Sequence, residues 1–170
     1  MGTRLALYQP DIPQNAGSLM RLCACLGAPL DIIEPCGFLL SDRNLRRAGM
    51  DYLDQLDLTR HASWEAWRAF HQTGPGAGRL VLLTTRGAQP YTGFQFRPGD
   101  TLMVGQESAG VPEEVHEAAD ARVLIPMRPG MRSLNVAQAA AMVLGEALRQ
   151  TDLFPKMAPF HNPESAACST

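Results

Sequence analysis

The clearest hydrophobic pattern in the chain lies between Leu134 and Gln150. Apolar residues recur there at three- and four-residue spacing, the period of one helix face: Val136, Ala137, Ala140, Val143, Leu144, Ala147 and Leu148. Asn135 comes directly before this stripe and Gln138 follows it three residues later, which is typical of a helix N-cap with a capping box. The pattern therefore predicts a long amphipathic helix that starts at about Leu134.

Short apolar runs earlier in the chain predict β-strands. They cover residues 4–8, 30–34, 56–60, 80–84, 101–104 and 122–125. Helical patterns separate them: Asn15 is expected to cap a helix that Gly27 ends, Ser63 to begin a second, and a third to follow Pro112. Residues 87–99 are expected to be irregular. Near-continuous apolar strands that alternate with helices indicate an α/β fold with a mostly parallel sheet flanked by helices.

Three of the predicted strands end in polar loops that contain glycine or proline and lead into helices. These loops are residues 9–18, 105–112 and 126–132. The carboxyl ends of parallel strands meet at one edge of a sheet, and helix N-termini there offer free backbone N–H groups to ligands. Ser133 and Asn135 are therefore candidate binding residues, although the alternative is that both only cap the last helix.

Length and composition restrict the possible classes of protein. The 170 residues suffice for one domain with a sizeable core, and an apolar content of 45% is ordinary for a soluble globular protein. No apolar run is long enough to span a bilayer, and the N-terminus lacks the features of a signal peptide. We therefore expect a cytoplasmic protein that does not bind membranes.

The net charge and the spacing of cysteines and histidines further restrict the possible ligands. A net charge of −2 provides no general attraction for nucleic acid, so an RNA site would need a local basic patch. Arg43, Arg46 and Arg47 are the candidate patch, with a solvated helix face as the alternative. The four cysteines and four histidines do not show the spacing of a metal site, so we expect no metal and reduced thiols.

Three separated segments resemble the sequence motifs of the SPOUT methyltransferases. They are Asn15-Ala16-Gly17 with Arg21, residues 102–112, and Ile125-Pro126-Met127 with Ser133-Leu134-Asn135. Within this family the chain is similar to the small TrmL-like enzymes that methylate the 2′-oxygen of the tRNA wobble ribose. The likeness runs to about Gln150 and includes residues 32–35, 45–52 and 83–85. One departure is Ala109, where relatives often carry an arginine.

The resemblance implies a fold that general topology rules would disfavour. Those rules predict an unknotted, doubly wound sheet. SPOUT proteins instead carry a deep C-terminal trefoil knot and form homodimers that share the active site. By this likeness, residues 1–150 are a single SPOUT methyltransferase domain, and residues 151–170 are a C-terminal tail.

The resemblance also implies S-adenosylmethionine-dependent 2′-O-methylation of the tRNA wobble nucleotide, position 34, with S-adenosylhomocysteine as product. It assigns cofactor binding to six residues: Leu83, Thr84, Gly105, Ile125, Met127 and Ser133. It places four polar residues at the catalytic centre: Arg21, Glu107, Ser133 and Asn135. A guanidinium does not lose its proton in proteins, so we expect Arg21 to hold RNA phosphate and the developing alkoxide. The alternatives are a 2′-O-methyltransferase of another RNA, such as rRNA, and a non-enzymatic nucleotide-binding module.

Overall fold

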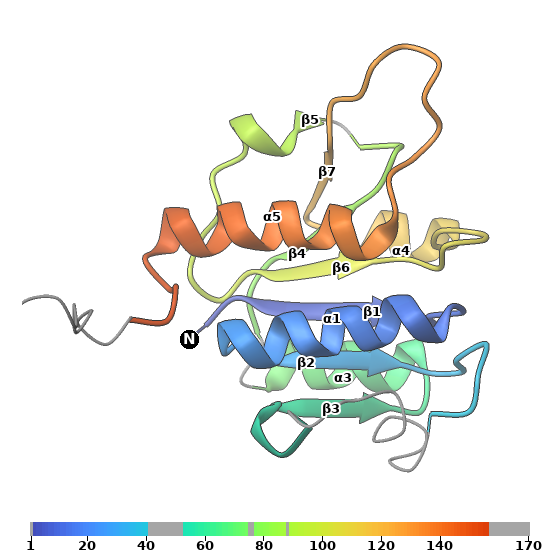
Figure 1. Cartoon of the computed structure of the whole chain (residues 1–170). Helices are drawn as coiled ribbons and strands as arrows, with labels where there is room; N and C mark the ends of the chain where they lie inside the picture. The colour runs from blue at the N-terminus through green and yellow to red at the C-terminus, as the bar shows by residue number, and fades with distance from the viewer. Residues whose placement is uncertain (1, 41–52, 75–76, 88, 157–170) are drawn as a thin grey trace, which may run out of the picture.

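A seven-stranded parallel sheet forms the centre of the molecule in the computed structural model, which describes residues 2–40, 53–74, 77–87 and 89–156 (Figure 1). The strands are β1 (Arg4–Tyr8), β2 (Leu30–Ile33), β3 (Leu58–His61), β4 (Leu80–Leu83), β5 (Gln89–Pro90), β6 (Thr101–Val104) and β7 (Ala121–Leu124). Their order in the sheet is β3-β2-β1-β6-β4-β7-β5, and every pair is parallel. All seven carboxyl ends therefore point to the same edge.

Helices cover both faces of this sheet (Figure 1). The described helices are α1 (Pro13–Leu26), α3 (Trp64–Thr73), α4 (Glu113–Ala118) and α5 (Val136–Thr151), with 3₁₀ turns η1 (Leu53–Gln55) and η2 (Tyr91–Gly93). Helices α1 and α5 pack side by side on one face, whereas α3 and α4 lie on the other. The molecule thus has three layers, with the sheet buried in the middle.

The alternation of side chains along β1 explains why two cores form. Leu5 and Leu7 pack with α1 and α5, and Ala6 and Tyr8 pack with the tryptophans of α3. Successive residues of a strand point to opposite faces, so a strand covered on both sides is apolar throughout. All five residues of β1 are buried, which is the burial expected of a central strand.

A buried ionic cluster stabilises the core on the α3 side. Asp31 on β2 is fully buried and accepts hydrogen bonds from Arg4 at 2.7 Å and from the Trp67 indole at 3.0 Å. His61 Nε2 lies 3.4 Å from the same carboxylate. A buried carboxylate is tolerated only when it is paired and hydrogen-bonded, and Asp31 meets both conditions.

The structure confirms the predicted parallel α/β sheet and most of the predicted elements. Asn135 is the N-cap of α5, since its side chain accepts from the backbone N–H groups of Ala137 and Gln138. Ser63 caps α3, and Gly27 ends α1 with a left-handed backbone, φ 65°.

Two predictions were wrong. Residues 87–99 are not simply irregular, because they contain β5 and η2. Asn15 does not cap α1, because Ile12 occupies the N-cap position and Pro13 begins the helix. Proline suits the first helical position, since its missing N–H would have no intrahelical partner there. Asn15 therefore lies inside the first turn, and its side chain is available for other contacts.

Some predictions concern residues outside the described part of the chain. The arginine patch of Arg43, Arg46 and Arg47 lies there, as does most of the predicted tail, residues 157–170. Among the helices that the structure describes, none has the length and apolar character needed to span a membrane.

Candidate functional site

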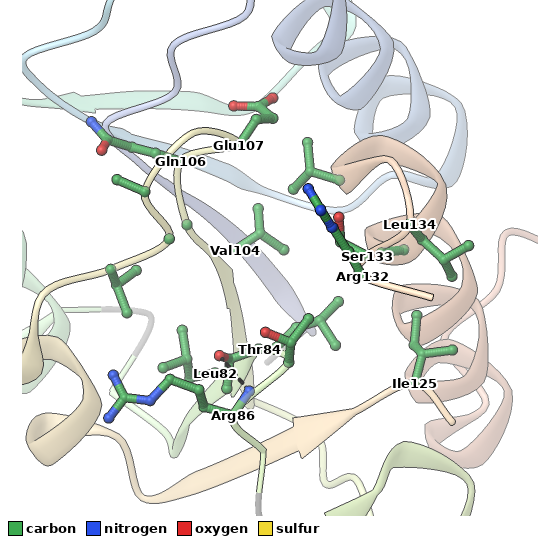
Figure 2. A pocket seen from close by; sticks show the side chains of 18 of the residues that line it. Leu82, Thr84, Arg86, Val104, Gln106, Glu107, Ile125, Arg132, Ser133 and Leu134 are labelled. Carbon is green, nitrogen blue, oxygen red and sulfur yellow. Dashed lines mark hydrogen bonds between the residues drawn. The ribbon is translucent and has the colours of Figure 1, made fainter. Parts of the chain in front are cut away.

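A cavity of about 410 Å³ opens where the loops after β4, β6 and β7 meet at the carboxyl edge of the sheet (Figure 2). Residues from all three loops and from the start of α5 line it. All six predicted cofactor-binding residues are among them: Leu83, Thr84, Gly105, Ile125, Met127 and Ser133. Cavities that hold small molecules commonly measure about 300–1,000 Å³, so the space suits a ligand of nucleoside size.

The 105–110 loop forms one wall of the cavity as a tight backbone turn. Gln106 and Gly110 exchange two backbone hydrogen bonds, each 2.9 Å long. A Cβ atom on Gly105 would lie 2.6 Å from the backbone carbon of Gly110 and 2.8 Å from a methyl of Val111. Only glycine fits at Gly105 without displacing the turn, because a Cβ contact under 3.0 Å is not tolerated.

Side-chain hydrogen bonds join the three polar loops into one network. Asn135 donates to Asn15 at 2.9 Å, and Asn15 donates to Glu107 Oε1 at 2.8 Å. Asn15 lies in α1, 120 positions from the α5 N-cap Asn135 and 92 positions from Glu107 in the loop after β6. The amide of Asn15 thus connects two of the predicted catalytic residues.

Asp11 adds a second connection between the first loop and the 105–110 loop. Its carboxylate accepts from the backbone N–H groups of Glu107 at 3.1 Å and Ser108 at 3.2 Å. The Ser108 hydroxyl donates to the same carboxylate. Sequence reasoning missed Asp11, and the only signal was an acidic residue between two prolines in a candidate loop.

The two neighbouring carboxyl groups have pKa values shifted in opposite directions. Hydrogen bonding from Glu107 and Ser108 holds the pKa of Asp11 well below its usual range. Burial, followed by the neighbouring Asp11 carboxyl, raises the pKa of Glu107. Glu107 lines the cavity, but its Oε2 is buried from solvent, next to the Asp11 carboxyl group.

The far end of the cavity contains polar side chains that sequence reasoning also missed. Figure 2 shows Arg86 at this end, away from Glu107 and Ser133. Arg86 pairs with Glu113 at 2.9 Å. His116 also lines the cavity and is buried, and burial followed by the Arg86 charge lowers its pKa, which favours a neutral imidazole. Neither residue belongs to a recognisable sequence pattern.

The four predicted catalytic residues do not all contact the cavity. Glu107 and Ser133 line it, and Asn135 reaches Glu107 through Asn15. Arg21 is exposed on α1 and is not among the lining residues. Arg132, which lies within the 126–132 loop, is a further cation that lines the cavity.

A parallel sheet with a nucleoside-sized cavity at its carboxyl edge is the architecture of many α/β proteins that bind nucleotides or cofactors, and sequence comparison specifies the family. The SpoU rRNA Methylase family matches residues 2–145, so the chain belongs to this family of RNA methylases.

Individual relatives are similar over nearly the whole chain. A protein of Beijerinckia indica, named tRNA (cytidine(34)-2′-O)-methyltransferase, is 66% identical over 154 residues, covering 90% of this chain and 94% of that protein. A solved structure described as "Structural insights into the 2-OH methylation of C/U34 on tRNA" is 44% identical. Its TM-score is 0.79, with 87% of this chain and 95% of that chain covered. The SpoU methyltransferase AviRb from Streptomyces viridochromogenes, in complex with the cofactor AdoMet, is 29% identical, with a TM-score of 0.76. The match covers 86% of this chain and 59% of the AviRb chain.

Proposed function

We propose that this protein is an S-adenosylmethionine-dependent methyltransferase that modifies the 2′-oxygen of the tRNA wobble nucleotide, position 34. The observation that carries the proposal is that Asn15, from the loop and first turn of α1, hydrogen-bonds both to Glu107 on the cavity wall and to Asn135 at the start of α5. The 66% identical relative named as a tRNA cytidine-34 methyltransferase supports the choice of substrate.

The cavity suits S-adenosylmethionine in size and in lining. Backbone groups at Gly105, Ile125 and Met127 lie at strand ends, where amides and carbonyls are available to an adenine ring. When bound, this cofactor supplies a methyl group that its sulfonium has already activated.

The protein's own contribution is to position the acceptor ribose and to stabilise charge. Glu107 and Ser133 lie on the cavity wall, and Asn135 is held beside Glu107 through Asn15. Holding reactants in line contributes a large part of the barrier reduction in group transfer. Arg21 lies outside the cavity lining, so we assign it to the RNA side, where its cation would stabilise phosphate and the developing 2′-alkoxide.

We also propose the C-terminal knot in the domain of residues 1–150. In the sheet, β7 lies between β4 and β5, although these two strands are consecutive in the chain. The chain stays against β7 after β4 ends, since the Thr84 N–H donates to the Val123 carbonyl at 3.0 Å and continues the ladder. A Cβ on Gly87 would lie 2.6 Å from the Val123 carbonyl carbon. This close contact of Gly87 with β7 supports a knot in which the chain after β7 passes through the loop that follows β4.

A homodimer is the third part of the proposal. Ile12, Leu134 and Met142 are exposed apolar residues on or next to α1 and α5, which pack side by side. Neighbouring exposed apolar side chains favour association with another surface. Exposed Arg21 on α1 would then lie near such an interface, as expected if two subunits share the site.

Nucleoside mass spectrometry tests the activity. Purified protein is incubated with S-adenosylmethionine and unmodified tRNA transcripts, and digests are analysed for 2′-O-methylcytidine and 2′-O-methyluridine. We expect methylation at position 34 only, and its loss in transcripts that carry 2′-deoxy at that position. Methylation of rRNA fragments but not tRNA would redirect the proposal to the second substrate. Cofactor binding without turnover on either RNA would favour the non-enzymatic module.

A further inference from the structure

We propose that Asp11 is a positioning residue, which fastens the 105–110 loop to the loop before α1 and thereby holds Glu107 at the cavity. The expected effect on the reaction rate rests on the proposed methyl transfer. The fastening of the loop does not depend on the proposed function. No sequence motif considered above includes Asp11 among the residues of the site.

The contacts of Asp11 are concentrated on two adjacent residues of the opposite loop. Its two carboxylate oxygens accept separately, Oδ1 from the Glu107 N–H at 3.1 Å and Oδ2 from the Ser108 N–H at 3.2 Å, with the Ser108 hydroxyl as a third donor. A carboxylate that bridges two consecutive amides fixes the orientation of the peptide between them. That peptide carries the Glu107 side chain, so Asp11 determines where its carboxyl group points.

Asp11 is itself held in place from the other side. Gln9 donates its backbone N–H to Ile33 at 2.9 Å, and Gly37 donates to Pro10 at 2.9 Å. Gly37 packs so closely that a Cβ there would lie 2.9 Å from both Cα and Cβ of Asp11. The loop before α1 is therefore anchored to the loop after β2, and a rigid anchor is what a positioning residue requires.

Loss of the Asp11 carboxylate would affect the cavity through Glu107, which lines it. With the loop fastened, Glu107 Oε1 accepts from Asn15, and the Glu107 carboxyl group is held next to that of Asp11. Without the Asp11 carboxylate, the amides of Glu107 and Ser108 lose their acceptor and the loop is free to move. Glu107 would then lose its bond to Asn15, because both contacts require the same loop position.

Amide hydrogen exchange tests the fastening without any assay of activity. We expect Asp11→Ala to accelerate exchange of the Glu107 and Ser108 amides by about tenfold or more, since each loses a charge-assisted hydrogen bond. The Gly110 amide, which bonds to Gln106, serves as an internal reference and should change little. Asp57→Ala is the matched control, because Asp57 is an exposed aspartate next to the edge strand β3. Unchanged exchange at Glu107 and Ser108 would overturn the inference.

A double-mutant cycle tests the route through Glu107. We expect Asp11→Ala to lower kcat by about 10- to 100-fold, and Asp11→Asn, which retains one acceptor oxygen, to restore part of the rate. In a Glu107→Gln background, Asp11→Ala should lower kcat by less than about twofold, because residues that act as a unit are not additive. Full additivity together with a large fall in Tm would mean a merely structural role and would overturn the inference. If the wild-type protein is inactive, the proposed function fails, and the exchange data still decide whether Asp11 fastens the loop.

Discussion

Gly105→Ala is the substitution that most directly tests the cavity as a cofactor site. The added methyl group would lie 2.6 Å from the Gly110 carbonyl carbon, 2.7 Å from its oxygen and 2.8 Å from Val111 Cγ1. Two of these atoms are backbone, so rotation of a side chain cannot relieve the clash. The 105–110 turn must move, and this turn forms part of the cavity wall.

The size of the effect follows from the cost of overpacking. An extra methyl group in a well-packed region costs about 1–3 kcal/mol. If the bound state requires the original turn, that cost appears in binding, where 1.4 kcal/mol corresponds to about tenfold in Kd. We therefore expect S-adenosylmethionine affinity to fall roughly 5- to 100-fold, and more for Gly105→Val.

Isothermal titration calorimetry with S-adenosylmethionine and S-adenosylhomocysteine measures this change, and thermal unfolding shows whether the variant is folded. Gly93→Ala is the matched control, because a Cβ at Gly93 would meet nothing within 4 Å and this residue does not line the cavity. Its affinity should equal that of the wild type. An unchanged Kd for folded Gly105→Ala would refute the assignment of this cavity to the cofactor.

Three further predictions concern different parts of the molecule. Arg21→Ala should sharply lower methyl transfer while calorimetry finds near-normal cofactor affinity, since Arg21 is outside the cavity lining; a large loss of affinity would contradict its RNA-side role. Asp31→Ala leaves buried Arg4 without its carboxylate and should reduce the free energy of unfolding in urea by about 3–5 kcal/mol. A loss below about 1 kcal/mol would show that the pair contributes little. Burial raises the pKa of Cys23 to about 12, so iodoacetamide at pH 8 should label the exposed Cys25 first in native protein. Peptide mass spectrometry measures the order of labelling. Equal labelling would mean that α1 opens readily.

Much of the architecture followed from local pattern. The stripe that begins at Val136 and the cap at Asn135 predicted α5 because helix periodicity and capping depend on residues within one or two turns. The central strands were predicted because double-sided burial requires uninterrupted apolar residues. Parallel strands then place their carboxyl ends together, so the meeting of three polar loops followed as well. The structure places Leu83, Gly105 and Met127 around one cavity for this reason.

The sequence by itself therefore determined most of the elements, the parallel sheet and the edge at which the cavity lies. Only the tertiary structure decided the pairing of side chains across that edge. The residues around Asn15 predicted that it caps a helix, whereas in the fold its side-chain amide joins Glu107 and Asn135. Asp11 carried no local signal beyond its place between two prolines, because its partners are 96 and 97 positions away. Hydrogen bonds between distant segments depend on the strand order β1-β6-β4-β7, and the hydrophobic period of each segment contains no information about its neighbours in the sheet.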